Sequence, residues 1–193
     1  MRNFLKIASN VQTTPLLLAL ARQPLLWNEH TLRTQYPGTP HSEVDDIWLR
    51  FQTLPEPGRE VEVVDQHESV WYPAINALPE VRPLVFNLMA AVQGERLGRV
   101  MVTRLRAGGR IYPHTDDGAH AEYYERFHIV LASGQGCKFR AGDEIVHMAA
   151  GEVWWFQNAL EHEVINDSKD ERLHLIVDIR CPQSRQSPGN GGA

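Results

Sequence analysis

The second half of the chain consists of short, β-prone segments that turn residues separate from one another. Steps such as Gly-Gly, Ser-Gly and Ala-Gly-Asp punctuate them. Many short strands at this spacing predict a β-sandwich or a barrel, because each turn returns the chain to the same small set of sheets. The predicted strands cover residues 100–106, 127–132, 137–140, 144–148, 152–157, 162–165 and 173–180.

Two helices are predicted in the first half of the chain. Thr14 followed by Pro15 is a typical helix start, and residues 16–27 then have a helical pattern with a break near Pro24. Residues 83–92 have the length and residue choice of the second helix. The apolar sides of these helices are expected to cover one sheet.

Residues 46–51 alternate in character as a half-buried strand does, and residues 61–64 are predicted to be a short strand. One face of the first strand is mixed polar and aromatic, so Trp48 and Arg50 are candidate substrate-binding residues. The alternative is an edge strand that turns this face to water. The side chains expected on the two faces are Ile47, Leu49 and Phe51 on one and Asp46, Trp48 and Arg50 on the other.

Residues 1–182 are expected to form a single domain. At 193 residues the chain is long enough to bury a sizeable core but short for two full domains. Within it, residues 1–97 would form a helical and mixed cover and residues 98–182 the β core. Residues 183–193 are rich in Ser, Gly, Pro and Gln and are predicted to be disordered.

The distribution of charge and the number of cysteines limit which binding partners and which cellular compartment are expected. The formal net charge is -5, and neither sign is gathered into a block that would suit nucleic acid or a membrane surface. No stretch approaches the roughly 20 apolar residues of a membrane helix. The chain has only two cysteines, too few for a disulfide framework, so a cytoplasmic location is predicted.

His114 and Asp116 form a His-x-Asp pair in a segment that continues a strand, so both side chains can project from one face. Four predicted strands separate Asp116 from His162, and chain reversal could bring this histidine alongside the pair. Two imidazoles and one carboxylate on one face of a metal are typical of non-haem iron(II) oxygenases. The pair alone is a weak signal among nine histidines. Asp117 is an alternative carboxylate, but on an extended segment it points to the opposite face.

Arg172 strengthens this interpretation. It follows His162 by ten residues, across a turn at residues 167–170. A hairpin there would place Arg172 on the neighbouring strand, where its guanidinium could point into the same cavity and bind a carboxylate through two hydrogen bonds. His174 and Asp178 share a face with Arg172, and they either line the pocket and orient its ligands or form a satisfied polar pair in the sheet.

The region from Pro113 to Arg180 contains the segments PHTD, RFHIVL, GCKFRAGDE, GEVWWFQN, HEVINDSKDER and HLIVDIR. In this combination and order they resemble the aspartyl/asparaginyl β-hydroxylase family of Fe(II)- and 2-oxoglutarate-dependent oxygenases. The chain is also similar to bacterial free-proline hydroxylases. The resemblance covers a little over a third of the chain, and it implies a mainly β, double-stranded β-helix of jelly-roll or cupin-like type with the N-terminal helices packed on one sheet.

The resemblance implies Fe(II) and O2 with 2-oxoglutarate as co-substrate, and hydroxylation of an aliphatic C–H of an amino acid or amino-acid residue. Peptide hydroxylases of the family in animals lack the carboxylate ligand, whereas this chain has Asp116. The free-proline hydroxylases have this carboxylate as well, so the resemblance to them favours a free amino acid over a peptide; the expected substrate is a small molecule or a peptide. By similarity, the metal ligands are His114, Asp116 and His162, Arg172 and His128 bind the co-substrate, and Arg126 lines the substrate pocket, where it is the candidate for the carboxylate of an amino-acid-like substrate.

Two other functions fit the same fold class. A cupin-like metalloprotein would share the jelly roll and the histidines but would not use 2-oxoglutarate, and it has no general need for a buried guanidinium at Arg172. A binding module without catalysis would keep the fold and a structural metal. Other histidines, His120 and His147, are expected to be ordinary loop and strand residues.

Overall fold

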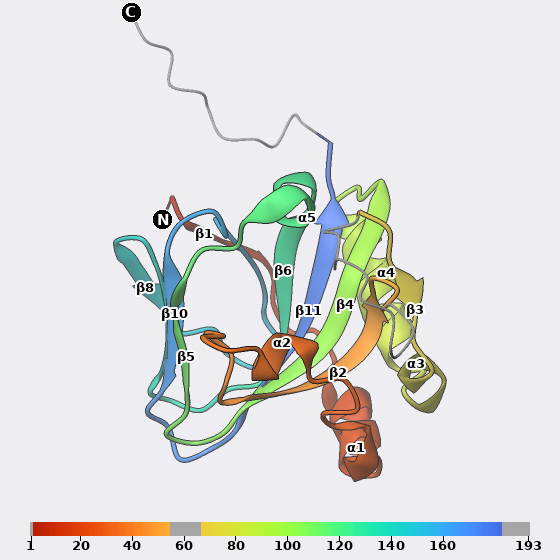
Figure 1. Ribbon diagram of the computed structural model, residues 1–193, viewed down its shortest axis with the longest axis horizontal. Coiled ribbons are helices and arrows are strands. Elements are labelled where there is room, and N and C mark those ends of the chain that lie inside the picture. The colour runs from red at the N-terminus through yellow and green to blue at the C-terminus, as the bar shows by residue number, and fades with distance from the viewer. Residues whose placement is uncertain (1, 55–66, 183–193) are drawn as a thin grey trace, which may run out of the picture.

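Two antiparallel sheets face each other in the computed structural model, which describes residues 2–54 and 67–182 (Figure 1). The larger sheet has seven strands in the order β1-β9-β6-β11-β4-β2-β3, and the smaller has four in the order β5-β10-β7-β8. The strands of the larger sheet are β1 Phe4–Ala8, β2 Val44–Phe51, β3 Val70–Trp71, β4 Arg96–Leu105, β6 Glu125–Ala132, β9 Val153–Phe156 and β11 Arg172–Arg180. Those of the smaller sheet are β5 Arg110–His114, β7 Cys137–Ala141, β8 Glu144–Val146 and β10 His162–Asn166.

The helices at Thr14–Ala21, Ala74–Ala77 and Val81–Ala91 pack on the outer face of the seven-stranded sheet, as predicted for the helices of the first half of the chain. Leu16 and Leu20 of the first helix and Val85 of the fourth share one apolar core with residues of β4, β6 and β11. Among the described residues, none of the helices has both the length and the apolar character to cross a bilayer. The helices are α1 Thr14–Ala21, the 3-10 turn η1 Pro24–Leu26, α2 Leu32–Gln35, α3 Ala74–Ala77, α4 Val81–Ala91 and α5 Gly118–Tyr123.

The helix predicted over residues 16–27 is broken near Pro24, as expected. The α-helix ends at Ala21, and the chain continues as a separate 3-10 turn from Pro24. Proline has no N–H to donate and a ring that collides with the preceding turn, so the helix stops before it. The second predicted helix is confirmed, with its start two residues earlier, at Val81.

All the strands predicted in the second half of the chain are present, which confirms the mainly β double-stranded β-helix. The first half is more than a cover, because β1, β2 and β3 belong to the larger sheet and β1 pairs with β9. The predicted strand at residues 61–64 and the tail at 183–193 lie outside the described residues. That residues 1–182 form a single domain stays a prediction.

The side chains of strand β11 alternate between the two faces of the larger sheet. Leu175, Val177 and Ile179 are fully buried against the helices. Residues two apart on a strand share a face, so Arg172, His174, Ile176 and Asp178 point the other way, toward the smaller sheet. One strand therefore carries both the helix-covered core and a row of buried polar groups.

A β-bulge in β2 overturns the expected faces of that strand. Trp48 pairs with Met101 and Arg50 with the adjacent Val100, so the alternation shifts between them. Phe51 consequently stacks on Trp48, with ring centroids 3.8 Å apart, instead of joining Ile47 in the helix-covered core.

The turn after β10 is not a hairpin, and the prediction of one was wrong. Strand β10 pairs with β5 and β7, whereas β11 pairs with β4 and β6, so the chain crosses from one sheet to the other. Asn166, with no exposed surface, holds this crossover. Its Nδ2 donates to the carbonyl oxygens of Leu105, Arg106 and Asp170, and its Oδ1 accepts from Ser168.

We expect Asn166→Ala to lower the free energy of unfolding by about 2–5 kcal/mol, because buried carbonyls lose their donor and a buried hydrogen-bond network is broken. Urea unfolding followed by far-UV circular dichroism measures the change. Asn87→Ala, at an exposed position of α4, is the matched control and should change stability by less than about 0.5 kcal/mol. Equal effects of the two substitutions would contradict the role given to Asn166.

Candidate active site

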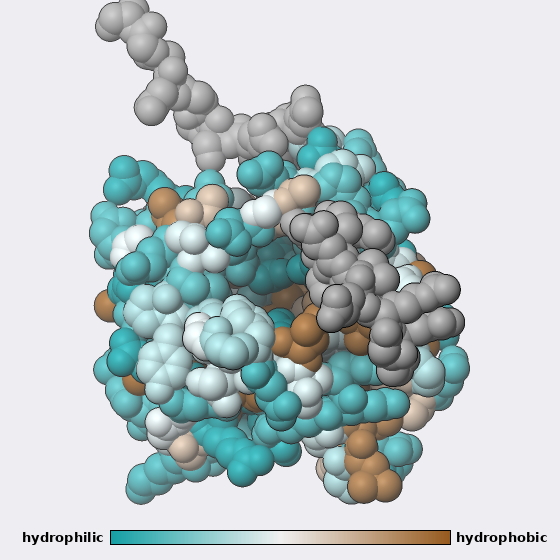
Figure 2. All heavy atoms as spheres, viewed as in Figure 1, coloured by the Kyte–Doolittle hydropathy of each residue, from teal (hydrophilic) through white to brown (hydrophobic). Residues whose placement is uncertain are grey.

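A cavity of about 180 Å³ lies between the two sheets. It is lined by β5 and β10 on one side, by β4, β6 and β11 on the other, and by the segment that contains α2. The face of the molecule that carries α2 is hollowed near its centre (Figure 2). Most of the candidate residues named from the sequence line this cavity: His114, Asp116, Arg126, His128, His162 and Arg172.

Two histidines and an aspartate converge on one point of the cavity. His114 ends β5 and His162 begins β10, and the two are direct partners across the strand pair, with ring centroids 4.2 Å apart. Asp116 follows two residues after His114, and its Oδ1 lies 3.8 Å from the His114 Nε2. One potential ligand atom from each of the three residues lies within 4.8 Å of the others. This spacing suits a single metal ion.

Both histidines present an unprotonated nitrogen to that point. The Nδ1–H of His114 donates to the carbonyl oxygen of Tyr112 at 2.8 Å, and the Nδ1–H of His162 donates to that of Leu160 at 2.9 Å. In a neutral imidazole the other nitrogen, Nε2, then carries a lone pair. Burial lowers the pKa of both side chains, that of His162 to about 4, so each ring is neutral at pH 7, as a metal ligand must be.

A network of hydrogen-bonded, charged side chains orients Asp116. Its Oδ2 accepts a hydrogen bond of 2.6 Å from Arg126 Nη1. The same guanidinium donates from Nε and Nη2 to Asp178, at 2.8 and 3.1 Å, and Asp178 also accepts from His120 Nε2 at 2.9 Å. Burial alone would raise the pKa of Asp178, but Arg126 and His120 hold it well below its usual range. Asp178 is thus a buried anion with its acceptors used.

Arg172 is a buried cation without a carboxylate. It is 2% exposed, it forms no ion pair with any described residue, and its Nη2 donates to His174 Nδ1 at 3.0 Å. Burial lowers its pKa to about 10, so it remains charged at neutral pH. The guanidinium lies 5.8 Å from the ring centre of Phe139. A buried unpaired charge is costly, which makes this end of the cavity suited to an anionic ligand.

The structure places other sequence candidates away from the cavity. Trp48 is 2% exposed and packs with His30 and Phe51, and Arg50 lies over the ring of Trp71 on the opposite side of the sheet. Neither is among the residues that line the cavity: the bulge after Trp48 brings Phe51 to it and turns Arg50 away, and Trp48 is buried behind Phe51. Their assignment to the substrate stays a prediction.

Asp117 is exposed beside the triad, as its position on an extended segment predicts. His120 is not the ordinary loop residue expected, because it lies in α5, is 2% exposed and bonds to Asp178. Cys137 is buried in β7 and is a free thiol.

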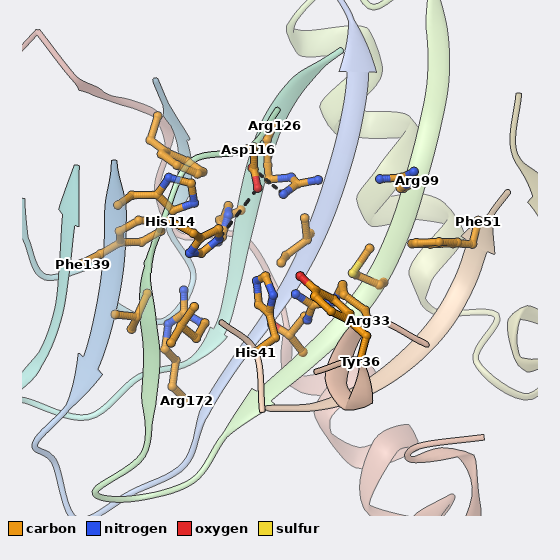
Figure 3. A pocket seen from close by; sticks show the side chains of 18 residues that line it. Arg33, Tyr36, His41, Phe51, Arg99, His114, Asp116, Arg126, Phe139 and Arg172 are labelled. Atoms are coloured by element: carbon orange, nitrogen blue, oxygen red, sulfur yellow. Dashed lines mark hydrogen bonds and ion pairs between the residues drawn. The ribbon is translucent and has the colours of Figure 1, made fainter. Parts of the chain in front are cut away.

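The sequence does not indicate that the segment containing α2 forms one wall of the cavity. Arg33 and His41 from this segment point into the cavity (Figure 3). Arg33 is held by two hydrogen bonds to Asp46, of 2.8 and 2.7 Å, and the His41 ring packs against His114 with centroids 4.7 Å apart. No local pattern marks these residues, because their approach to the triad depends on the path of a loop far from it in sequence.

Comparison with known proteins supplies the family. The sequence profile of the aspartyl/asparaginyl beta-hydroxylases matches residues 18–182. The chain belongs to this family. An L-proline cis-4-hydroxylase of Rhizobium meliloti is 36% identical over 80 residues, and the aspartyl/asparaginyl beta-hydroxylase of Homo sapiens is 32% identical over 99 residues. These matches cover 42% and 49% of this chain, but only 29% and 13% of those two proteins.

Solved structures share the fold of this aspartyl/asparaginyl beta-hydroxylase family member. A prolyl hydroxylase from Trichoplax adhaerens, in complex with a peptide fragment of the hypoxia inducible factor oxygen degradation domain, has a TM-score of 0.59 and 12% identity, over 96% of this chain and 86% of that one. A 2OG-Fe(II) oxygenase family oxidoreductase from Burkholderia pseudomallei has a TM-score of 0.54 and 16% identity, over 83% and 77%. At such identities the likeness concerns the fold alone.

We expect Asp178→Asn to destabilise the protein by roughly 3–5 kcal/mol at pH 7, because it leaves the buried Arg126 with one carboxylate instead of two. The folded-state pKa of Asp178 lies below its ordinary value of 3.8, so its contribution is present above that pH and is lost as the pH falls through the folded pKa. The difference between wild type and variant should therefore shrink in acid. Urea unfolding at several pH values measures it.

Asp143→Asn is the matched control. Asp143 pairs with Arg2 at the surface, where the carboxylate side chain is 74% exposed, and its loss should cost less than about 1 kcal/mol. A stability difference for Asp178→Asn that is as small as the control's, or that does not change with pH, would contradict the buried network.

Proposed function

We propose that this protein is an Fe(II)- and 2-oxoglutarate-dependent oxygenase that hydroxylates an aliphatic C–H of an amino acid or of an amino-acid residue. The observation that carries the proposal is the buried Arg172, which has no carboxylate partner among the described residues and shares a cavity with the His114, Asp116 and His162 cluster. A metal-binding protein that does not use a diacid has no need of such a group.

The donor set fits iron(II). Two neutral imidazoles and one carboxylate on one side of a metal leave the remaining positions open for co-substrate and dioxygen. Both histidines are held in the correct tautomer by backbone carbonyls, and Arg126 orients the Asp116 carboxylate, which are the supporting contacts that tune such ligands. When bound, iron, 2-oxoglutarate and dioxygen together supply the oxidising power, and 2-oxoglutarate becomes succinate and carbon dioxide.

The far end of the cavity fits the distal carboxylate of 2-oxoglutarate. Arg172 can donate two parallel hydrogen bonds to it from its planar fork. Thr103, on the neighbouring strand β4, lines the same cavity, and its buried Oγ1 has no partner in the described part of the chain. We propose that the hydroxyl donates to the same carboxylate. His128, whose ring also lines the cavity, completes this wall.

The substrate end is proposed to hold an amino-acid-like molecule. Three of the five N–H groups of Arg126 are used by Asp116 and Asp178, and one N–H remains on each terminal nitrogen. These two could bind a substrate carboxylate near the metal. The relatives include an L-proline cis-4-hydroxylase and an aspartyl/asparaginyl beta-hydroxylase, and we propose a free amino acid and a peptide as the two substrate classes to compare.

His162→Ala is expected to abolish both iron(II) binding at the site and 2-oxoglutarate decarboxylation, because two ligands of one metal rarely replace three. Metal content after dialysis and succinate formation measure the two effects. His147→Ala is the matched control, since His147 bonds to the Cys137 carbonyl and does not line the cavity. Full turnover by His162→Ala would overturn the metal assignment.

Arg172→Lys is expected to weaken the apparent affinity for 2-oxoglutarate by roughly 1.5–3 kcal/mol, because lysine keeps the charge but loses the planar fork. The KM for 2-oxoglutarate, taken from succinate formation, measures the change. Arg140→Lys, in the surface cluster with Glu161 and Glu163, provides the control and should leave this KM unchanged. An unchanged KM in Arg172→Lys would show that the diacid binds elsewhere.

A further inference from the structure

We propose that His174 is a positioning residue that fixes Arg172 and His128 in the co-substrate pocket through one atom, its Nδ1. The proposal rests on the proposed function, because it treats Arg172 as the residue that binds 2-oxoglutarate. His174 itself does not line the cavity. It acts on the ligand through the two residues that do.

The hydrogen bonds determine which nitrogen of each ring carries the proton. Arg172 Nη2 lies 3.0 Å from His174 Nδ1, and a guanidinium can only donate, so His174 Nδ1 is the acceptor. His128 Nδ1 also lies 3.0 Å from this atom, which has a single lone pair, so His128 Nδ1 is the second donor of a three-centre hydrogen bond in which it shares that lone pair with Arg172. Both rings are neutral, because burial and then the charge of Arg172 hold their pKa values well below the usual range. His174 thus carries its proton on Nε2 and His128 on Nδ1.

His174 occupies a buried and fixed position beside Arg172 and His128. It has no exposed surface and lies in the middle of β11, where it pairs with Thr103 of β4 on one side and Val130 of β6 on the other. The two neighbouring strands fix its backbone, and its ring packs edge-on against that of His128, with centroids 5.3 Å apart. His174 Nδ1 is the one hydrogen-bond acceptor that the side chain of Arg172 has within the described residues.

The hydrogen bonds to His174 leave the other N–H groups of Arg172 and the Nε2 of His128 available to a ligand. One terminal nitrogen of Arg172 is anchored, and the remaining N–H groups keep a fixed direction for a carboxylate. The Nε2 of His128 is buried, has no partner in the described part of the chain and carries a lone pair, so it accepts from a donor in the cavity, such as a water molecule or a protonated ligand group. Without His174 Nδ1, Arg172 and His128 would each lose their fixed orientation.

The test compares two substitutions of His174 that differ in whether the new side chain can accept a hydrogen bond at the position of Nδ1. In His174→Asn the amide oxygen lies near the position of Nδ1 and can accept both hydrogen bonds, whereas His174→Leu fills a similar volume and accepts none. We expect His174→Leu to raise the KM for 2-oxoglutarate about tenfold or more, with kcat at saturating 2-oxoglutarate within about twofold of wild type. The KM of His174→Asn should stay within about threefold of wild type.

Two further measurements separate positioning from mere folding. Calorimetric titration of the iron(II)-loaded protein with 2-oxoglutarate, without oxygen, should show the same loss of affinity in His174→Leu. His147→Leu is the control and should keep the wild-type affinity, because in the described part of the chain His147 bonds to the Cys137 carbonyl and to neither Arg172 nor His128. Nitrogen-15 NMR of the wild-type protein should find the proton of His174 on Nε2 and that of His128 on Nδ1.

Each outcome decides the proposal. An unchanged KM in His174→Leu, an equal rise in both variants, or a proton on His174 Nδ1 would overturn it. If His174→Leu does not fold, the NMR measurement and His174→Asn still decide. Absence of 2-oxoglutarate turnover and binding in the wild-type protein would instead count against the proposed function, while the proton positions would still test the role of His174.

Discussion

The ion pair between Arg126 and Asp178 joins the interior of the larger sheet to the candidate metal centre. Taking an arginine and an aspartate out of water costs several kcal/mol for each ion, and the pair is tolerated only if nearly every donor and acceptor is used. Here Arg126 also donates to Asp116, and His120 occupies the remaining side of Asp178. Because Asp178 and Arg126 are direct partners across β11 and β6, the orientation of Asp116 depends on the register of two strands. If either strand slipped by one residue, its ion would turn toward the helices and the pair would be broken.

Much of the site could be predicted because strands alternate with a period of two. The spacing of His114 and Asp116 placed both on one face, and the spacing of Arg172 and Asp178 placed these on another, and the cavity brings the two faces together. The order of the motifs supplied the family, and with it His128. These features are local in sequence, so a strand period and a residue type are enough to find them.

What could not be predicted depends on which strand lies beside which. The pattern of residues 46–51 gave no sign of the bulge that brings Phe51 to the cavity in place of Arg50. The turn before Arg172 has the composition of a hairpin, yet the chain crosses between sheets there, and Asn166 satisfies the backbone of the crossover. The approach of His41 to the triad is set by packing between distant segments. A single sequence records such pairings only weakly.

The two faces of β11 make opposite contributions to stability. Leu175 and Val177, buried against the helices, each contribute about 1.5–3 kcal/mol relative to an exposed side chain. On the cavity side of the same sheet, the charge of Arg172 in β11, the Nε2 of His128 in β6 and the Oγ1 of Thr103 in β4 have no partner of the required kind among the described residues, and each costs about 1–3 kcal/mol or more. The apolar face therefore offsets groups that a ligand or water in the cavity can satisfy. Since a ligand that binds the folded state alone adds its binding free energy to stability, the cavity is the part of the fold that gains most from being filled.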